Sequence, residues 1–260
     1  MLVSASAMSQ EITARFVKAD DTFFKKPDPL AAQWNKVAAT TISLFPQNIT
    51  TPSVYQTSVA SLDVRALHNG DSMALLLVWE DPTQNMNVSL DHFSDACAIQ
   101  FPIHKAEATS PFMGNKNAPV AITHWKAIWQ RDVDTRYQQV TDLYPNTWTD
   151  SDRFGKSVAI DAKNPVSQIR RASPVEELIA EGFGTLTTQQ HQDARGKGIW
   201  KDGKWFVVLT RLLKSKDKQD PALDIGKRTS IAFALWEGGH KDVGARKNYA
   251  MWTPFVLEKK

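Results

Sequence analysis

The sequence predicts a mainly β protein, an antiparallel β-sandwich with a few inserted helices. Apolar stretches of strand length recur along the chain and are separated by polar turns. Two of these stretches flank Lys201-Asp202-Gly203-Lys204, and the central Asp-Gly dipeptide suits a tight hairpin turn. Helical patterns occur only as short insertions between the strands, so the fold class is that of packed antiparallel layers.

The first four strands are expected at residues 58–68, 73–79, 95–103 and 119–129. Residues 58–68 alternate loosely between apolar and polar, and Asn69-Gly70 follows as a turn in which both residues tolerate positive φ. Residues 73–79 are continuously apolar, as in a strand buried on both faces. Pro102 closes the third strand, and the fourth places alternate residues, among them Trp125 and Trp129, on one face.

The remaining strands are expected at residues 199–200, 205–213, 229–236 and 249–257. Helices are expected at 30–43, 132–143 and 175–180. The last of these follows Ser173-Pro174 and carries Glu176 and Glu177 in its first turn, a pattern typical of a helix start. Residues 164–198 are interpreted as a long excursion between strands.

The length allows one large or two small domains, and no boundary is evident along the chain. The chain has 260 residues, 42% hydrophobic and 23% charged, which suffices for a full core. We expect a single domain over residues 1–260, in which residues 1–10 are either disordered or the remnant of a removed signal segment. The net charge is +3, and the sequence contains no block of Lys and Arg residues that would indicate nucleic-acid binding. The apolar runs are far shorter than the roughly 20 residues of a membrane-spanning helix, so no membrane span is expected.

The single cysteine, Cys97, excludes several classes of site. One thiol cannot form an intrachain disulfide, an all-cysteine zinc site, a cysteine-held iron–sulfur cluster or covalently attached haem. We expect Cys97 to be an inert residue of a strand. The nucleophile-elbow, P-loop and His-Glu-x-x-His motifs are absent from the sequence, so no enzymatic activity is predicted.

Tryptophans are unusually numerous, at nine. They suit either core packing or an aromatic platform for a sugar or a planar cofactor. Those in the strand-rich part are Trp125, Trp129, Trp148, Trp200, Trp205, Trp236 and Trp252.

Two local stretches favour a planar cofactor. In the first, Met113 stands between Phe112 and Gly114 in a loop beside a strand, where a glycine lets a flat ring approach the backbone. The second runs from Trp236-Glu237-Gly238-Gly239 through Arg246-Lys247 to Met251-Trp252, which is a strand, a glycine-rich turn, a basic pair and a strand.

Together with Asp95-Ala-Cys-Ala-Ile-Gln-Phe-Pro102, these stretches resemble the haem b-binding γ subunits of periplasmic molybdenum enzymes of the type II DMSO-reductase family. That group includes ethylbenzene dehydrogenase, dimethylsulfide dehydrogenase, selenate reductase and chlorate reductase. The resemblance covers about residues 55–257 and is strongest to the chlorate reductase γ subunits. Its specificity comes from the order and spacing of short motifs.

The resemblance implies one non-covalent, six-coordinate haem b, whose iron is bound by Met113 and Lys247. An alignment slip of six residues would make Lys241 the ligand in place of Lys247. Residue types alone favour a histidine such as His124 as the partner of Met113, because a lysine binds iron only as the neutral amine and its pKa is ordinarily ~10.4. Four neighbours are expected to contact the ring: Phe112, Gly114, Trp125 and Trp252. Arg246 is expected to pair with a propionate.

With both axial positions filled by the protein, the site suits electron transfer and not catalysis. The resemblance further implies an iron–sulfur β subunit and a molybdopterin-containing α subunit as partners, a soluble cytochrome c-type carrier, and a periplasmic location. Two other hypotheses remain at this point. One is a carbohydrate-binding β-sandwich module that uses tryptophan platforms, and the other is a hydrolase with paired carboxylates.

Overall fold

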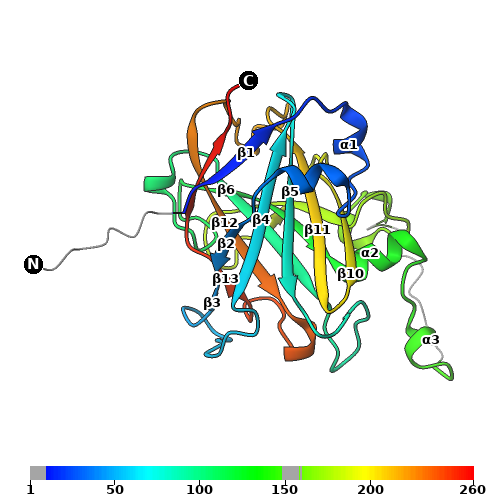
Figure 1. Ribbon diagram of the computed structural model, residues 1–260. Helices are drawn as coiled ribbons and strands as arrows, with labels where there is room; N and C mark the ends of the chain where they lie inside the picture. The colour runs from blue at the N-terminus through cyan, green and yellow to red at the C-terminus, as the bar shows by residue number, and fades with distance from the viewer. Residues whose placement is uncertain (1–9, 148–157, 159) are drawn as a thin grey trace, which may run out of the picture.

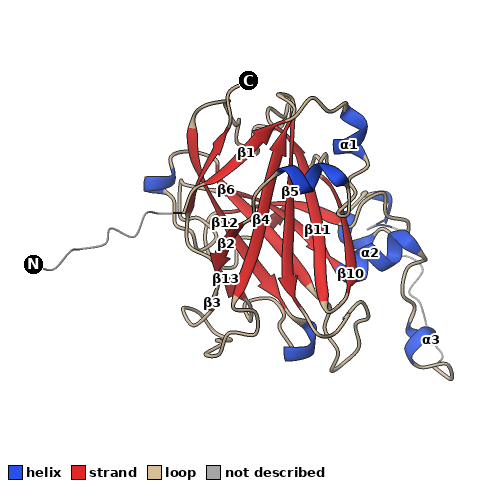
Figure 2. Cartoon of the chain, viewed as in Figure 1, coloured by secondary structure: helices blue, strands red, loops and turns tan. Residues whose placement is uncertain are grey.

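The computed structural model describes residues 10–147, 158 and 160–260, and its strands form two layers (Figures 1 and 2). Within the described residues there are fourteen strands: β1 (Ile12–Phe16), β2 (Thr40–Ser43), β3 (Phe45–Pro46), β4 (Ser61–His68), β5 (Ser72–Glu80), β6 (Ala96–Pro102), β7 (Val120–Lys126), β8 (Val175–Ala180), β9 (Thr187–Thr188), β10 (Arg195–Lys201), β11 (Lys204–Leu212), β12 (Arg228–Trp236), β13 (Asn248–Tyr249) and β14 (Thr253–Leu257). The short helical elements are α1 (Asp21–Lys25), η1 (Ala32–Lys36), η2 (Ala106–Ala108), α2 (Ala127–Asp134), α3 (Val140–Leu143), η3 (Pro165–Ser167) and η4 (Gly238–His240).

One hydrogen-bonded path runs through both layers in the order β10-β11-β5-β4-β1-β14-β12-β6-β7-β8-β9. The first layer is built on β10, β11, β5 and β4, and the second on β12, β6, β7 and β8. The path crosses between the layers at β1 and β14. Strand β1 is parallel to both of its neighbours, whereas the other pairings are antiparallel. The predicted β-sandwich with inserted helices is therefore confirmed, with one parallel strand, β1, joining its two layers.

The space between the layers is filled by apolar side chains, and tryptophans lie at its centre. Trp79 and Trp205 stack with ring centroids 6.3 Å apart, and Trp125 packs edge-on against Trp205 at 4.9 Å. Cys97 is fully buried in the same core, where burial raises the pKa of its thiol. Packing between the two layers is thus the role of Trp79, Trp125 and Trp205. Trp148 lies outside the described residues.

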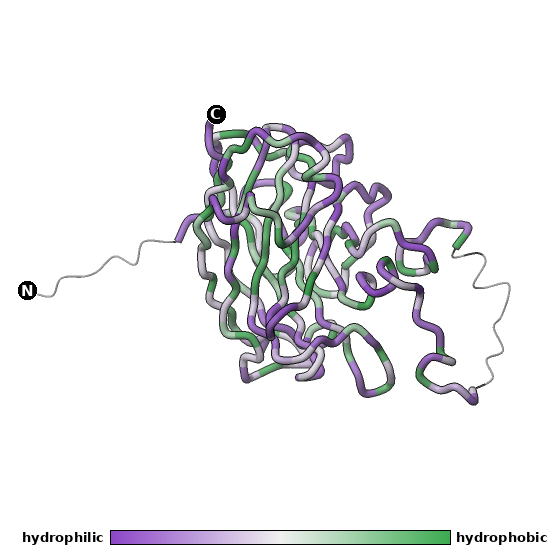
Figure 3. Tube along the Cα trace, turned by 45° about the vertical axis from the view of Figure 1, so that its right-hand side comes forward, coloured by the Kyte–Doolittle hydropathy of each residue, from purple (hydrophilic) through white to green (hydrophobic). Residues whose placement is uncertain are grey.

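The outer faces of the two layers are covered differently. On the first layer, Phe24 of α1 and Trp34 of η1 pack over Leu67 and Leu76. On the second layer, the apolar face made by β6, β7 and β8 is covered by loop side chains that include Met113. Figure 3 shows the hydrophobic stretches along the strands and the hydrophilic chain in the loops. No helix in the described part of the chain has the length and apolar character to cross a membrane.

Four predicted elements differ from the structure in type or extent. Residues 175–180 are strand β8 and not a helix, because Glu176 and Glu177 find tertiary partners within the sheet and do not act as helix-start residues. Glu176 pairs with Lys126 at 2.5 Å, and Glu177 accepts the Ala194 N–H at 2.8 Å.

The predicted helix 30–43 is reduced to η1, after which residues 40–43 pair with β4 as β2. The predicted strand 119–129 ends at Lys126, where α2 begins, so Trp129 lies on a helix. The predicted helix 132–143 is split between the end of α2 and α3.

Candidate functional site

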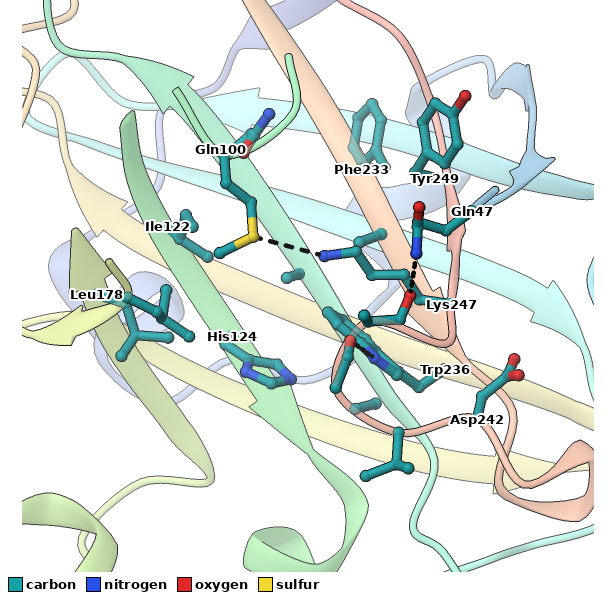
Figure 4. Close-up of a pocket in the computed structure, with 18 of the residues that line it drawn as sticks. Gln47, Gln100, Ile122, His124, Leu178, Phe233, Trp236, Asp242, Lys247 and Tyr249 are labelled. Atoms are coloured by element: carbon teal, nitrogen blue, oxygen red, sulfur yellow. Dashed lines mark hydrogen bonds between the residues drawn. The ribbon is translucent and has the colours of Figure 1, made fainter. Parts of the chain in front are cut away.

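A cavity of about 540 Å³ lies on the outer face of the second layer (Figure 4). That volume falls within the roughly 300–1,000 Å³ of small-molecule and cofactor sites. The floor consists of alternate residues of three adjacent strands, which share one face because side chains alternate along a strand. These residues are Ala96, Ala98 and Gln100 of β6, Ile122, His124 and Lys126 of β7, and Ala232, Ala234 and Trp236 of β12.

Loops close the cavity above this floor, and their side chains are mostly apolar. Residues 111–113 lie on one side, and residues 242–245 with Lys247 and Tyr249 lie on the other. Phe112 packs edge-on against Tyr249 with ring centroids 5.3 Å apart, which joins the two sides. The result is a largely apolar chamber with few polar groups.

Met113 is held in a backbone conformation that non-glycine residues rarely adopt, at φ 65°. Such a conformation costs about 1–3 kcal/mol and persists only where neighbouring structure enforces it. Here the Met113 carbonyl accepts the Gly182 N–H at 2.7 Å. Gly114 follows at φ 74°, and a Cβ there would lie 2.8 Å from the Ala118 carbonyl oxygen and 2.9 Å from that of Ala180. Position 114 therefore requires glycine, and this turn presents the Met113 side chain to the cavity.

Lys247 enters the cavity opposite Met113, from the residue directly before β13. Its Nζ lies 3.9 Å from Met113 Sδ and 5.1 Å from the Trp236 ring centroid (Figure 4). Within the described part of the chain, no carboxylate lies within 4.0 Å of this amine. Burial lowers its pKa from 10.5 to about 8. Less free energy is therefore needed to form the neutral amine that a metal ion binds.

Two buried amides hold the loop that carries Lys247. The Gln47 backbone N–H donates to the Lys247 carbonyl at 3.0 Å, and Gln47 Nε2 donates to the Ala245 carbonyl at 3.0 Å. The Asn248 side chain donates to Asp242 at 3.3 Å and accepts the Ser58 N–H at 3.2 Å. Sequence reasoning missed both residues, because their partners lie up to 198 positions away.

The ligand pair inferred from the resemblance comes together in space. Phe112 lines the same cavity. Lys241, the alternative ligand, is exposed and lies outside the cavity lining. Of the three partners that the sequence leaves open for Met113, Lys247 is the one whose contact with the sulfur the structure shows, whereas His124 lies in the floor.

Three of the four expected ring contacts, and Arg246, do not line the cavity. Trp125 is on the opposite face of β7, fully buried between the layers, because strand alternation gives the cavity side to its neighbours. Trp252 packs on the apolar face of the second layer and donates to the Thr109 carbonyl at 2.8 Å. Gly114 serves the turn, and Arg246 donates to the Lys241 carbonyl at 3.4 Å.

Trp236 and His124 take the place expected of Trp125. Their rings stack with centroids 4.8 Å apart, and Trp236 Nε1 donates to the Gly244 carbonyl at 2.9 Å. His124 Nε2 is buried with no hydrogen-bond partner among the described residues. Burial, with added repulsion from Lys126 and Lys247, lowers the pKa of His124 well below its usual value, so this ring is neutral. In the sequence, the position of Trp236 directly before the glycine-rich turn Glu237-Gly238-Gly239 indicated that this residue could lie at the cofactor site.

The residues present fit a flat, six-coordinate iron porphyrin. A thioether sulfur and a weakly basic amine face each other, and both are donor types that haem iron or other transition metals accept when the amine is neutral. The surrounding wall is apolar and includes stacked aromatic rings that suit a planar ligand. The strained backbone at Met113 is the kind of feature that marks functional positions.

Comparison with known proteins gives one family model and several relatives. The family model described as "Ethylbenzene dehydrogenase" matches residues 31–248. A protein of Haloferax mediterranei, provisionally named the respiratory nitrate reductase heme subunit ORF7, is 24% identical over 95% of this chain and 73% of its own length. The chlorate reductase subunit gamma of Ideonella dechloratans is 27% identical over 86% and 76%, respectively. The dimethylsulfide dehydrogenase subunit gamma of Rhodovulum sulfidophilum is 25% identical over 90% and 79%.

Proposed function

Because this chain belongs to the ethylbenzene dehydrogenase family, we propose that it is a non-catalytic electron-transfer subunit that carries one non-covalent haem b. Membership of this γ-subunit family was predicted from the order of short motifs and is confirmed by the family match and the relatives. The name of the Haloferax relative, a heme subunit, supports the choice of cofactor.

The observation that carries the proposal is the approach of Met113 and Lys247 across an apolar cavity. When bound, haem b supplies reversible one-electron transfer at its iron. Met113 and Lys247 would occupy both axial positions, which leaves substrate no open position at the metal. The apolar wall excludes water, and Phe112, Trp236 and His124 would contact the ring.

The partners follow from the same family membership. Two relatives are named as gamma subunits, so we infer that this chain works beside a molybdopterin-containing α subunit and an iron–sulfur β subunit. It would pass electrons between the clusters and a soluble cytochrome c-type carrier in the periplasm. The named relatives include a chlorate reductase and a nitrate reductase subunit, and we propose that the partner enzyme is a reductase of this kind. Chlorate is the first substrate of the partner enzyme to test.

The test is a haem titration of the full chain followed by absorption spectroscopy and by extraction with acidified organic solvent. The proposal predicts one haem per chain, a Soret band shifted from that of free haem, a reduced haem b spectrum and complete extraction of the cofactor. A spectrum identical to that of free haem would exclude the proposal. A colourless protein that binds oligosaccharides would instead support the carbohydrate-binding alternative.

A further inference from the structure

Three buried carboxylates meet at one end of the two layers, outside the cavity. Asp81 directly follows β5, Asp95 directly precedes β6 and Glu237 directly follows β12. Glu237 and Asp95 come together because the neighbouring residues Trp236 and Ala96 are paired in register between β12 and β6. Asp81 arrives from the other layer. One oxygen from each carboxylate lies within 4.8 Å of the other two.

Asp81 is the residue that points to a missing partner. It is fully buried, and its Oδ1 accepts the Thr83 N–H at 3.1 Å. Its Oδ2 is buried without a hydrogen bond of ordinary geometry among the described residues, and the nearby Trp79 indole N–H, also unpaired, is a donor that lowers the pKa of the carboxyl only in part. A buried charged oxygen without a partner costs more free energy than an ordinary hydrogen bond returns, so such atoms usually bind an ion or water.

The charges in the cluster are not balanced by the protein. In the described ranges, His240 beside Glu237 is the one basic group that pairs with any of the three carboxylates. Burial raises the pKa of Asp81 to about 6. Burial, and after it the charge of Asp81, raises the pKa of Asp95 to about 7. Without a cation, Asp81 and Asp95 therefore repel each other in a desolvated place.

Backbone amides hold two of the carboxylates in position. Asp95 accepts the N–H groups of Gly238 and Asn85, both at 2.8 Å, and the Trp205 indole N–H at 2.9 Å. Glu237 accepts the backbone N–H groups of Gly239 and His240, both at 2.9 Å. These bonds fix the carboxylates but do not neutralise them, and each carboxylate has about four lone-pair sites to offer.

We propose that Asp81, Asp95 and Glu237 bind one divalent cation, Ca²⁺, which ties the ends of β5, β6 and β12 together across the two layers. Ca²⁺ takes six to eight oxygen ligands at about 2.3–2.6 Å, so two oxygens on one ion can lie up to about 5 Å apart. The observed spacing falls within that limit. Thr83 Oγ1, 2.7 Å from Asn85 Oδ1 and 3.5 Å from Glu237 Oε1, offers a further hard oxygen at the rim.

The experiment uses the full chain after treatment with a chelator. CaCl₂ at about 100 times its Kd is expected to raise Tm by about 5 °C, and MgCl₂ at the same concentration by less. Tb³⁺, which replaces Ca²⁺ at oxygen sites, should show emission on tryptophan excitation, because Trp205 donates directly to Asp95. That emission should be displaced by CaCl₂.

The variant is Asp81→Asn, which keeps the size of the side chain and removes its charge. It should weaken Ca²⁺ binding at least tenfold, whereas Asp224→Asn, an exposed carboxylate paired with Lys227, should bind as the wild type does. A wild-type chain whose Tm does not rise with CaCl₂ and that shows no displaceable Tb³⁺ emission would overturn the proposal, even if the variant fails to fold. Unchanged affinity in Asp81→Asn would also overturn it. Lys247→Ala should keep the Ca²⁺ response, so this test is independent of haem.

Discussion

Lys247 Nζ lies 3.9 Å from Met113 Sδ, although 134 positions of sequence separate the two residues. The strand β6–β7 connection brings the methionine and the β12–β13 connection brings the lysine, each from above the same sheet face. Within the described residues, no carboxylate lies within 4.0 Å of Lys247 Nζ that would explain its position. Their meeting in an apolar cavity is the basis of the predictions that follow.

Gly114→Ala should destabilise the Met113 turn. The added Cβ would approach the carbonyl oxygens of Ala118 and Ala180, and the residue would have to keep φ 74°. Gly184 is a matched control, since it has φ 80° and open space around its Cβ position. We expect a loss of about 1 kcal/mol in the free energy of unfolding for Gly184→Ala, and at least twice that for Gly114→Ala. Urea denaturation measures both, and equal losses would contradict the account of the turn.

The haem-free chain should become more stable at alkaline pH because of Lys247. Burial lowers the pKa of this lysine from 10.5 to about 8 in the folded chain. Between these values the unfolded chain binds more protons, so the free energy of unfolding rises with pH, by up to about 3 kcal/mol. Lys247→Met lacks this titration. Urea denaturation at a series of pH values should give a steeper rise for the wild type, and parallel curves would show that Lys247 titrates normally.

Met113→His should keep the haem but lower its midpoint potential. A thioether ligand favours the reduced iron relative to an imidazole. Histidine also tolerates the left-handed backbone better than most residues. We expect a decrease larger than about 59 mV, the equivalent of a tenfold change for one electron. Redox titration followed by absorption tests this, and an unchanged potential would mean that Met113 is not a ligand.

Replacement by phenylalanine should affect stability at Trp125 and haem affinity at Trp236. Trp125 is in the core and donates to Gln130 at 3.2 Å, so Trp125→Phe should cost about 1–3 kcal/mol of stability and leave haem affinity unchanged. Trp236 lines the cavity, so Trp236→Phe should weaken haem binding up to about tenfold. Denaturation and haem titration of both variants distinguish the roles, and a reversed pattern would refute them.

Local signals explain which parts of the fold were predictable from sequence. The β10–β11 hairpin was predicted because an Asp-Gly dipeptide favours a tight turn with positive φ. In the structure, Asp202 and Gly203 adopt φ values of 52° and 74°, as this turn requires. Strand β8 was misread because its glutamates look like helix-start residues until Lys126 and Ala194 are present in space. Propensity was overridden there by tertiary partners.

The candidate site divides in the same way. Met113 and Lys247 came from a resemblance carried by short motifs, and physical reasoning on residue types would have chosen a histidine for the second position. Trp125 was misplaced because the sequence shows the alternation along β7 but not which face meets the other layer. The carboxylates of Asp81, Asp95 and Glu237 meet only through strand register and layer packing, so no local sequence pattern predicts this cluster.

The most direct test of the central claim compares absorption spectra of three lysine and methionine variants at equal haem load. Met113→Ala and Lys247→Ala should each shift the Soret band and alter the reduced spectrum, since each would remove one axial bond. Lys241→Ala, an exposed lysine six residues before Lys247, should keep the wild-type spectrum. If Lys247→Ala keeps the wild-type spectrum, or Lys241→Ala loses it, Met113 and Lys247 do not form the axial pair.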